Sequence, residues 1–363
     1  MKNFKYIISS ILILAASVCA FTGCGNNSDN DKPNNTITIN GYVIESKNNE
    51  KIVNKYVGND EHLTIPEGVT QLGERAFQDN TKIKSVKLSN TIKGIGEYCF
   101  SGCNLLFEIE CSNSLTTIDD CAFYSCDLLT NIKMGEGIQT ISESAFSNCP
   151  SLNYNEYGNA NYFGNETNPY IALIKAKKES IYTCEINNDV KILANGCFSG
   201  CYNLSTISIP NQITVIPNEA FSHAHIKNIN LPNNLQNIEK EAFYSCIYLE
   251  SISLPETLLE IGELAFYWNR KLTNIQLPTN LKKIKTKAFN YCENLIEVNI
   301  PSSVDFIGKL AFEDCYDLSS VNFETITGWS AGENVVDKEY LSYPATAATF
   351  IRYTYANFDW MRK

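Results

Sequence analysis

Apolar residues return along the chain at regular intervals. In the stretch EAFYSCIYLESISLPETLLEIGELAF, residues 241–266, an Ala-Phe pair ends at Phe243 and recurs at Phe266. Between the two pairs, Leu249, Ile252 and Leu254 alternate with polar residues, as in a short strand that Pro255 ends. A second extended apolar piece follows, and the segment around the Phe suits a tight helical turn. The pattern therefore predicts one coil of chain per repeat.

The repeat Phe recurs through most of the sequence. Every step equals that from Phe243 to Phe266, except a much longer step that ends at Phe198 and a step after Phe221 that is one residue shorter. A fixed period in the twenties is typical of a solenoid, in which each unit buries its apolar face against its neighbours. We predict roughly eleven coils, whose strands lie about 4.8 Å apart in a parallel sheet. The repeat phenylalanines are Phe77, Phe100, Phe123, Phe146, Phe198, Phe221, Phe243, Phe266, Phe289 and Phe312.

The long step is explained by an insertion at residues 154–180. It contains Gly-Asn turns followed by the apolar run Tyr170 to Ile174. We expect a hairpin or loop that replaces the Phe turn of one coil and projects from the solenoid. Insertions of this kind often lie on a binding face, and the alternative is a bulge without function. The candidate contact residues are Tyr157, Tyr162, Phe163 and Tyr170.

Two segments outside the repeats are predicted to close the solenoid. Residues 36–62 alternate apolar and polar residues and would pair as strands on the first coil. The repeats then occupy residues 63–324. Residues 325–363 are rich in Trp, Tyr and Phe and would cap the last coil, with a short helix after Pro344. Caps are needed because an open end exposes core and unpaired strand edge.

The repeat CxxLxxIxLPxxLxxIGxxAF resembles the leucine-rich repeat of the BspA-like family of bacterial surface proteins, which are often interpreted as adhesins. The resemblance covers about residues 60–324, and the closing run AATFIRYTYANFDWMRK also resembles the end of such proteins. It implies a right-handed leucine-rich-repeat parallel β solenoid. It further implies a non-catalytic surface protein that adheres to host matrix proteins or to other cells.

The N-terminus predicts export. Residues 1–23 combine a basic start with an apolar segment that is too short to span a membrane, as in a signal peptide. The sequence Phe-Thr-Gly-Cys resembles a bacterial lipobox, which implies cleavage before Cys24 and a lipid on its sulfur. Phe21 stands where such boxes usually carry Leu, and cleavage after Ala20 would instead give a freely secreted protein. Residues 24–35 are mostly polar and predict a flexible tether to a lipid-anchored domain on the cell surface.

Composition argues against nucleic-acid binding and catalysis. The net charge is −11, from 29 basic and 40 acidic residues, and no basic run is present. The chain has three histidines and no recognisable catalytic or phosphate-binding motif. His223 and His225 could offer two metal ligands, but they stand alone in the shortened turn, so a solvated turn is the better interpretation. We expect no cofactor, no metal and no enzyme activity.

Most of the 14 cysteines have a place set by the repeat. Seven lie three residues after a repeat Phe, where Asn80 and Asn269 stand in other coils. We predict a ladder of small side chains that bond the turn backbone. Neighbouring thiols would lie near disulfide range, but we favour reduced structural thiols over a disulfide framework. The ladder comprises Cys103, Cys126, Cys149, Cys201, Cys246, Cys292 and Cys315.

Two surfaces are candidates for binding. Outward positions of the strands carry small polar residues, such as Ser251 and Ser253, which suit weak contacts or carbohydrate hydroxyls. Aromatic residues follow the repeat Phe and would align as an aromatic ridge, either as a recognition surface or as a cover over the cysteines. We expect a monomer that binds extracellular protein or glycan ligands, or else a scaffold for envelope proteins. The ridge residues are Tyr124, Tyr202, Tyr244, Tyr248, Tyr267, Trp268, Tyr291 and Tyr316.

Overall fold

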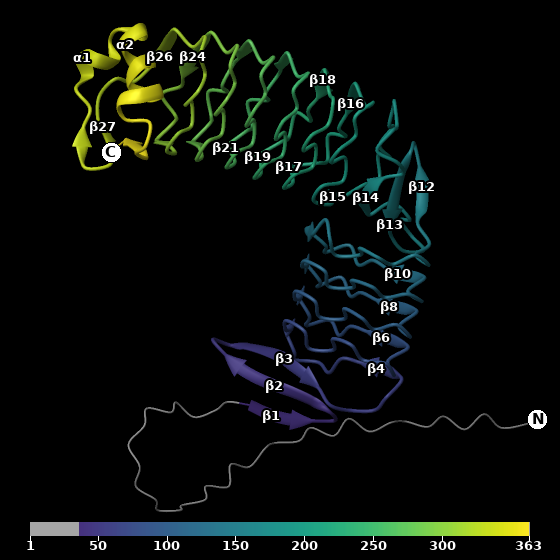
Figure 1. The fold of residues 1–363 in the computed structure, drawn as a ribbon. Coiled ribbons are helices and arrows are strands. Elements are labelled where there is room, and N and C mark those ends of the chain that lie inside the picture. The colour runs from purple at the N-terminus through teal and green to yellow at the C-terminus, as the bar shows by residue number, and fades with distance from the viewer. Residues whose placement is uncertain (1–35, 363) are drawn as a thin grey trace, which may run out of the picture. The chain divides into compact units, whose positions relative to one another are not determined.

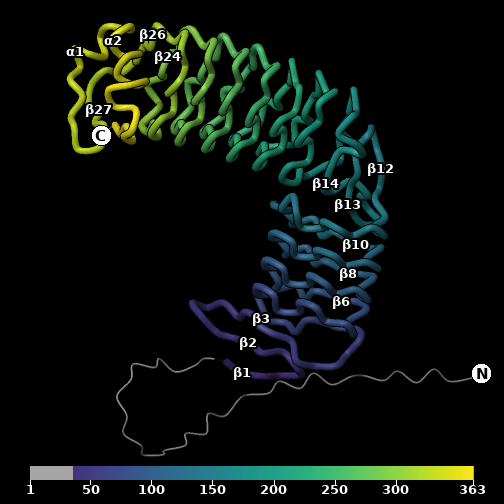
Figure 2. The backbone as a smooth tube through the Cα atoms, viewed as in Figure 1, coloured from purple at the N-terminus to yellow at the C-terminus, as the bar shows by residue number. Residues whose placement is uncertain are grey.

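Each repeat folds into one coil with a short strand on either side of an apolar core. The structure is a computed structural model that describes residues 36–362, and the fold is a parallel β solenoid of about 12 turns (Figure 1). Residues 36–363 form one compact unit. The insertion divides the coils into a first stack, residues 62–149, and a second stack, residues 181–323. Figure 2 traces the backbone through successive coils of each stack.

The first sheet contains the strands predicted from the Leu-x-x-Ile-x-Leu pattern. In the first stack they pair in the order β10-β8-β6-β4, all parallel, and each residue pairs with its counterpart one repeat away, as Val86 does with Ile109. The outward residues of these strands are half-buried or exposed throughout, which confirms the predicted inside and outside positions. The strands are β4 (His62–Thr64), β6 (Ser85–Lys87), β8 (Glu108–Glu110), β10 (Asn131–Lys133), β16 (Thr206–Ser208), β18 (Asn228–Asn230), β20 (Ser251–Ile252), β22 (Asn274–Ile275), β24 (Glu297–Ile300) and β26 (Ser320–Phe323).

The second extended piece of each coil forms a second row of parallel strands, which pair within each stack, apart from the strand at residues 192–193, which pairs with the insertion. Its strands are only two residues long, and each places one aliphatic side chain in the core, such as Leu72 or Ile261. The strands are β5 (Gln71–Leu72), β7 (Gly94–Ile95), β9 (Thr117–Ile118), β11 (Thr140–Ile141), β15 (Ile192–Leu193), β17 (Val215–Ile216), β19 (Asn237–Ile238), β21 (Glu260–Ile261), β23 (Lys283–Ile284) and β25 (Phe306–Ile307).

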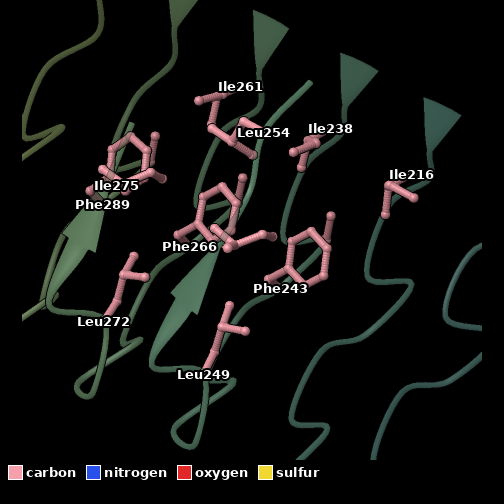
Figure 3. Close-up of a cluster of buried hydrophobic side chains, with 14 of the residues drawn as sticks. Ile216, Ile238, Phe243, Leu249, Leu254, Ile261, Phe266, Leu272, Ile275 and Phe289 are labelled. Carbon is pink, nitrogen blue, oxygen red and sulfur yellow. The ribbon is translucent and has the colours of Figure 1, made fainter. Parts of the chain in front are cut away.

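The repeat phenylalanines stack on one another through the core. Phe243 and Phe266 have ring centroids 5.2 Å apart and nearly parallel planes, and Phe266 and Phe289 follow at 5.3 Å (Figure 3). Leu249 and Leu272 take equivalent places in neighbouring coils. A fully buried Phe contributes roughly 1.5–3 kcal/mol by burial alone. The ladder therefore makes each coil depend on its neighbours.

The segment around each Phe is a series of tight turns and not a helix. Backbone φ is positive two residues before and two residues after most repeat phenylalanines, as at Leu264 (55°) and Trp268 (61°) around Phe266. A helix cannot contain such residues, because left-handed φ breaks its hydrogen-bond pattern. The expectation of a helical turn was wrong. Backbone amides that would bond within a helix donate instead to carbonyls of the next coil.

The turns are joined by a third ladder of hydrogen bonds. The amide of Phe123 donates to the carbonyl of Ala145 at 2.8 Å, and the amide of Ser125 donates to Ser147 at 3.0 Å. The intervening amides bond locally, as Tyr124 does to the carbonyl of Cys121. Amides therefore alternate between the next coil and their own turn.

The insertion is a hairpin, as predicted, but it does not project. The strands β12 (Asn155–Tyr157), β13 (Ala160–Phe163) and β14 (Ala172–Ala176) form an antiparallel meander, and β14 pairs in parallel with β15. Tyr162 and Phe163 are adjacent and fully buried, and they belong to different hydrophobic clusters. The apolar run Tyr170 to Ile174 is likewise divided, with Leu173 in one cluster and Ile171 and Ile174 in the other, so the insertion bridges two cores.

Both ends are closed by additional elements. At the N-terminal end, β1 (Thr36–Ile39), β2 (Tyr42–Lys47) and β3 (Glu50–Tyr56) form a meander, and β3 continues the second sheet at β5. At the other end are β27 (Trp329–Ala331), β28 (Asn334–Val335), α1 (Lys338–Leu341), α2 (Pro344–Thr349), the π-helix η1 (Phe350–Thr354) and β29 (Trp360–Arg362). The helix after Pro344 was predicted. The buried guanidinium of Arg352 donates to the carbonyls of Leu318 and Tyr316, which satisfies backbone groups of the last coil.

Candidate functional site

The predicted cysteine ladder is present and has a defined hydrogen-bond role. Each ladder thiol, with one exception, donates to the carbonyl of the repeat Phe in the preceding coil. The twelve cysteines within residues 36–362 are all free thiols, and Cys24 lies outside these residues. The S to O distances are 3.1 Å for Cys103, 3.1 Å for Cys126, 2.9 Å for Cys149, 3.0 Å for Cys246, 3.2 Å for Cys292 and 3.1 Å for Cys315.

Asn269 shows why the position three residues after the repeat Phe accepts either Cys or Asn. Its side-chain amide donates to the carbonyl of Phe243 at 2.8 Å, in the geometry of the neighbouring thiols. Cys201 is the exception, because the coil before it lacks a Phe turn. Burial raises the pKa of Cys103 and of Cys315 to about 12, so these thiols stay protonated and can donate. The ladder is thus structural.

The aromatic ridge is continuous over only part of its predicted length. Tyr244 stacks on Tyr267 with centroids 5.0 Å apart and planes 8° apart. Tyr267 then meets the edges of Trp268 and Tyr291 at 6.4 and 5.6 Å. These four residues form one cluster on adjacent coils. Trp268 is 37% exposed, and the other three are half-buried.

The other predicted ridge residues do not join this cluster. Tyr124, Tyr202 and Tyr316 are exposed and make no ring contact with another aromatic residue among residues 36–362. Tyr248 lies five residues after its Phe and packs instead on His225, with centroids 4.7 Å apart. Alignment requires a Tyr or Trp at the same offset from the Phe in an adjacent coil, and none of these four residues has one.

Charged side chains border the cluster. Arg270 lies over the Trp268 ring at 4.7 Å and pairs with Glu293 at 3.1 Å. Burial and the neighbouring Tyr244, Tyr291 and Asp314 raise the pKa of Tyr267. The Asp314 carboxylate is the main cause of the raised pKa of Tyr291. The hydroxyls of Tyr267 and Tyr291 therefore stay neutral at physiological pH beside an acidic margin.

Sequence reasoning missed two members of this surface. His223 contacts Tyr244 edge-on at 5.3 Å, and Arg270 covers Trp268 as described above. His223 lies two residues after Phe221, at the offset of Trp268 and Tyr291. Reading that offset in every coil would have found it.

The predicted contact residues of the insertion are only partly available to a ligand. Tyr162 and Phe163 are 0% and 1% exposed, so their assignment as contact residues was wrong. They face the cores because the meander continues the packing of the coils. Tyr157 and Tyr170 are half-buried and pack on each other at 5.8 Å, and the Tyr157 hydroxyl donates to Glu185.

The first sheet differs between the two stacks. In the first stack its outward face is charged, with ion pairs from Lys87 to Glu110 and from Lys133 to Glu108. In the second stack it is largely uncharged and lines a cavity of about 520 Å³ that includes Ser251, Asn274 and Gln276. Residues 36–362 contain no group of three side chains placed to hold a metal ion. They also contain no helix long and apolar enough to cross a membrane.

Together, the two short parallel sheets and the regular coils define the protein as a leucine-rich-repeat solenoid. The model of the BspA type leucine rich repeat region matches residues 55–168, 176–247 and 214–332, with six copies. The chain belongs to this family.

Several solved structures are similar to the chain. A leucine-rich cell surface protein from Faecalibacterium prausnitzii is 19% identical, with 82% of this chain and 96% of that chain covered and a TM-score of 0.36. A leucine-rich repeat protein from Bacteroides ovatus is 21% identical, with 79% and 94% covered and a TM-score of 0.32. One from Eubacterium ventriosum is 19% identical, with 82% and 99% covered and a TM-score of 0.41. No match was found among curated proteins.

Proposed function

We propose that this protein is displayed outside the cytoplasm, held by a lipid on Cys24, and binds macromolecular partners without catalysis. Family membership supports a repeat scaffold for protein interactions. The signal-like N-terminus supports export, and the adhesin interpretation of the family favours host matrix proteins or other cells as partners. The observation that carries the proposal is the cluster of Tyr244, Tyr267, Trp268 and Tyr291.

The cluster has the character of a recognition surface. Tyr and Trp give large contact areas at a modest cost in side-chain entropy, and they dominate the binding energy of many interfaces. Because the acidic margin includes Asp314 and Glu293, a partner with exposed Lys or Arg residues would fit best. The stacked rings are also held in place by the regular coils, which reduces the ordering cost of binding.

The test is binding of residues 36–363 to immobilised matrix proteins and glycans, beside a Tyr244→Ser, Tyr267→Ser, Trp268→Ser variant. Serine suits these offsets, because Ser101 occupies the first and Ser245 the second. We expect saturable binding by the wild type and at least a tenfold loss in the variant, because several contact anchors are removed.

The matched control is Tyr182→Ser, Tyr343→Ser, which removes two strongly exposed tyrosines outside the ridge. Equal binding by wild type and the ridge variant would contradict the role of the ridge. Binding to no surface in the panel would favour a scaffold for neighbouring envelope proteins.

A second candidate is glycan binding on the first sheet of the second stack. The cavity of about 520 Å³ with Ser, Asn and Gln side chains favours it, since these groups hydrogen-bond sugar hydroxyls. Soluble sugars would then compete for binding, and Asn274→Ala with Gln276→Ala would abolish it while the ridge variant would not.

A further inference from the structure

The ladder that joins the turns is interrupted between the two stacks. In a regular pair of coils, the amides of the repeat Phe and of the residue two positions later donate to the next coil. After Phe146 the next repeat Phe is Phe198, beyond the insertion. Within residues 36–362, the amides of Phe146 and Asn148 have no acceptor. Ser144 also lacks the positive φ that its counterparts adopt. The first stack therefore ends in two free donors, two residues apart.

The first turn of the second stack carries complementary acceptors. The carbonyl of Cys197 accepts from the amide of Ala176, at the end of β14, at 2.8 Å. The flanking carbonyls of Asn195 and Ser199 receive no donor from any described residue. The Asn195 side-chain oxygen is buried without a partner, and the Cys201 thiol lacks the Phe carbonyl that other ladder thiols contact. On this side, the groups that lack their hydrogen-bond partners are thus three oxygen acceptors and one weak donor, the Cys201 thiol.

A cavity of about 370 Å³ separates the two edges. Its lining includes Phe146 and Ser147 from the first stack, and Asn195, Ser199 and Cys201 from the second. An open surface hollow beside it shares Phe146, Ser147 and Lys175 in its lining and also includes Asn148. The stacks meet beside the cavity, where the Glu143 carboxyl lies against Gly196.

We propose that this cleft binds an extended peptide segment of a partner protein through its main chain. Donors spaced by two residues on one wall and carbonyls on the other are what a peptide backbone complements. The chain itself provides the precedent, because a turn of the next coil fills the same place in every regular pair.

Two peptide carbonyls would accept from Phe146 and Asn148, and a peptide amide would donate to the Ser199 carbonyl, because the neighbouring Cys197 carbonyl is already bonded to Ala176. Tyr154 and Ile174 add an apolar lining, which suits small or apolar side chains. None of these residues belongs to the aromatic ridge, so an experiment can contradict this site without contradicting the proposed function, and the reverse.

The probe is a phage-displayed library of random linear 12-residue peptides, selected on residues 36–363. The blocking variant is Ser147→Tyr, which places a large side chain in the cleft. Tyrosine is compatible with this position, because Tyr124 occupies the same offset one coil earlier. The matched control is Gln78→Tyr, at that offset in the first coil. We expect enriched peptides that bind the wild type and the control equally and the blocked variant at least tenfold more weakly.

A second measurement separates main-chain pairing from other contacts. N-methylation of alternate peptide amides removes donors without changing side chains. We expect loss of binding at one set of alternate positions and little change at the other, together with slowed exchange of the Phe146 and Asn148 amides in the complex. Failure to enrich any peptide that Ser147→Tyr blocks, or uniform tolerance of N-methylation, would overturn the proposal. Binding that only the ridge variant abolishes would overturn it as well.

Discussion

A single slot, three residues after each repeat Phe, sets how adjacent turns are locked together. A thiol there donates to the Phe carbonyl of the preceding coil, and Asn269 makes the same bond with its amide. The amide brings an oxygen that the thiol lacks, and this oxygen is buried without a partner. Leaving such a group unsatisfied costs about 1–3 kcal/mol.

Asn269→Cys is therefore expected to stabilise the protein. The thiol keeps the donor to Phe243 and removes the unpaired oxygen, so we expect the free energy of unfolding to rise by about 1 kcal/mol. Urea denaturation of residues 36–363 followed by circular dichroism measures this. Asn269→Ala, which loses the donor as well, serves as the comparison and should be less stable than the thiol variant. A thiol variant no more stable than wild type would contradict the role of the slot.

Glu239 gives a residue-scale prediction for pH. Burial is the main cause of its raised pKa, so the folded state disfavours the ionised carboxylate. The folded form holds the proton more tightly. Stability is therefore greatest below the ordinary pKa and falls as pH rises through the interval between the ordinary and the raised value. Glu239→Gln should raise the free energy of unfolding at pH 7 and converge with wild type below pH 4.

The control for this prediction is Glu61→Gln, at the other end of the coils. Glu61 pairs with Lys84 at 2.7 Å, which lowers its pKa, so its removal should leave stability at pH 7 unchanged or lower. Thermal unfolding of both variants across pH 3–8 gives the comparison. A Glu239 variant that is less stable than wild type at pH 7 would show that the carboxylate is favourably placed.

At the scale of elements, the period predicted the strands of both sheets but not the form of the turns. Alternation in Leu-x-x-Ile-x-Leu identifies the inward residues directly, because each inward residue is apolar. The turns use residues as different as Leu264, Glu241 and Cys121 at one left-handed position, so no residue type marks the conformation. It is set by hydrogen bonds to the next coil, which a single repeat does not display.

The insertion shows a second limit. Its Gly-Asn turn predicted the hairpin. Ile181, Cys184 and Ile186 have the spacing of the Leu-x-x-Ile-x-Leu pattern, and all three are buried. No strand forms at these three residues, because the preceding segment is a meander and not a regular coil. Whether Tyr162 and Phe163 face a core or solvent depends on packing between the two stacks. Local patterning carries no information on that packing.

Along the whole molecule, the hydrogen bonds between successive turns are regular within each stack, and this regular pattern breaks at the junction between the stacks. Each regular turn uses its amides alternately for its own turn and for the next coil, so a stack has free backbone groups only at its ends. At the outer ends, β3 extends the second sheet and Arg352 donates to carbonyls of the last coil, but the amides of Phe312 and Asp314 also have no acceptor among residues 36–362. The inner ends face the cleft. We therefore expect the protection of backbone amides from hydrogen exchange to be continuous along each stack and interrupted at Phe146.

Site-resolved hydrogen exchange of the free protein tests this expectation most directly. We expect slow exchange for the amides of Phe100, Phe123, Phe243 and Phe266, which donate to a neighbouring coil. We expect exchange at least a hundredfold faster for Phe146 and Asn148, which do not. Protection of Phe146 equal to that of Phe123 would contradict the account, since it would mean that the ladder continues through the junction and leaves no edge for a peptide.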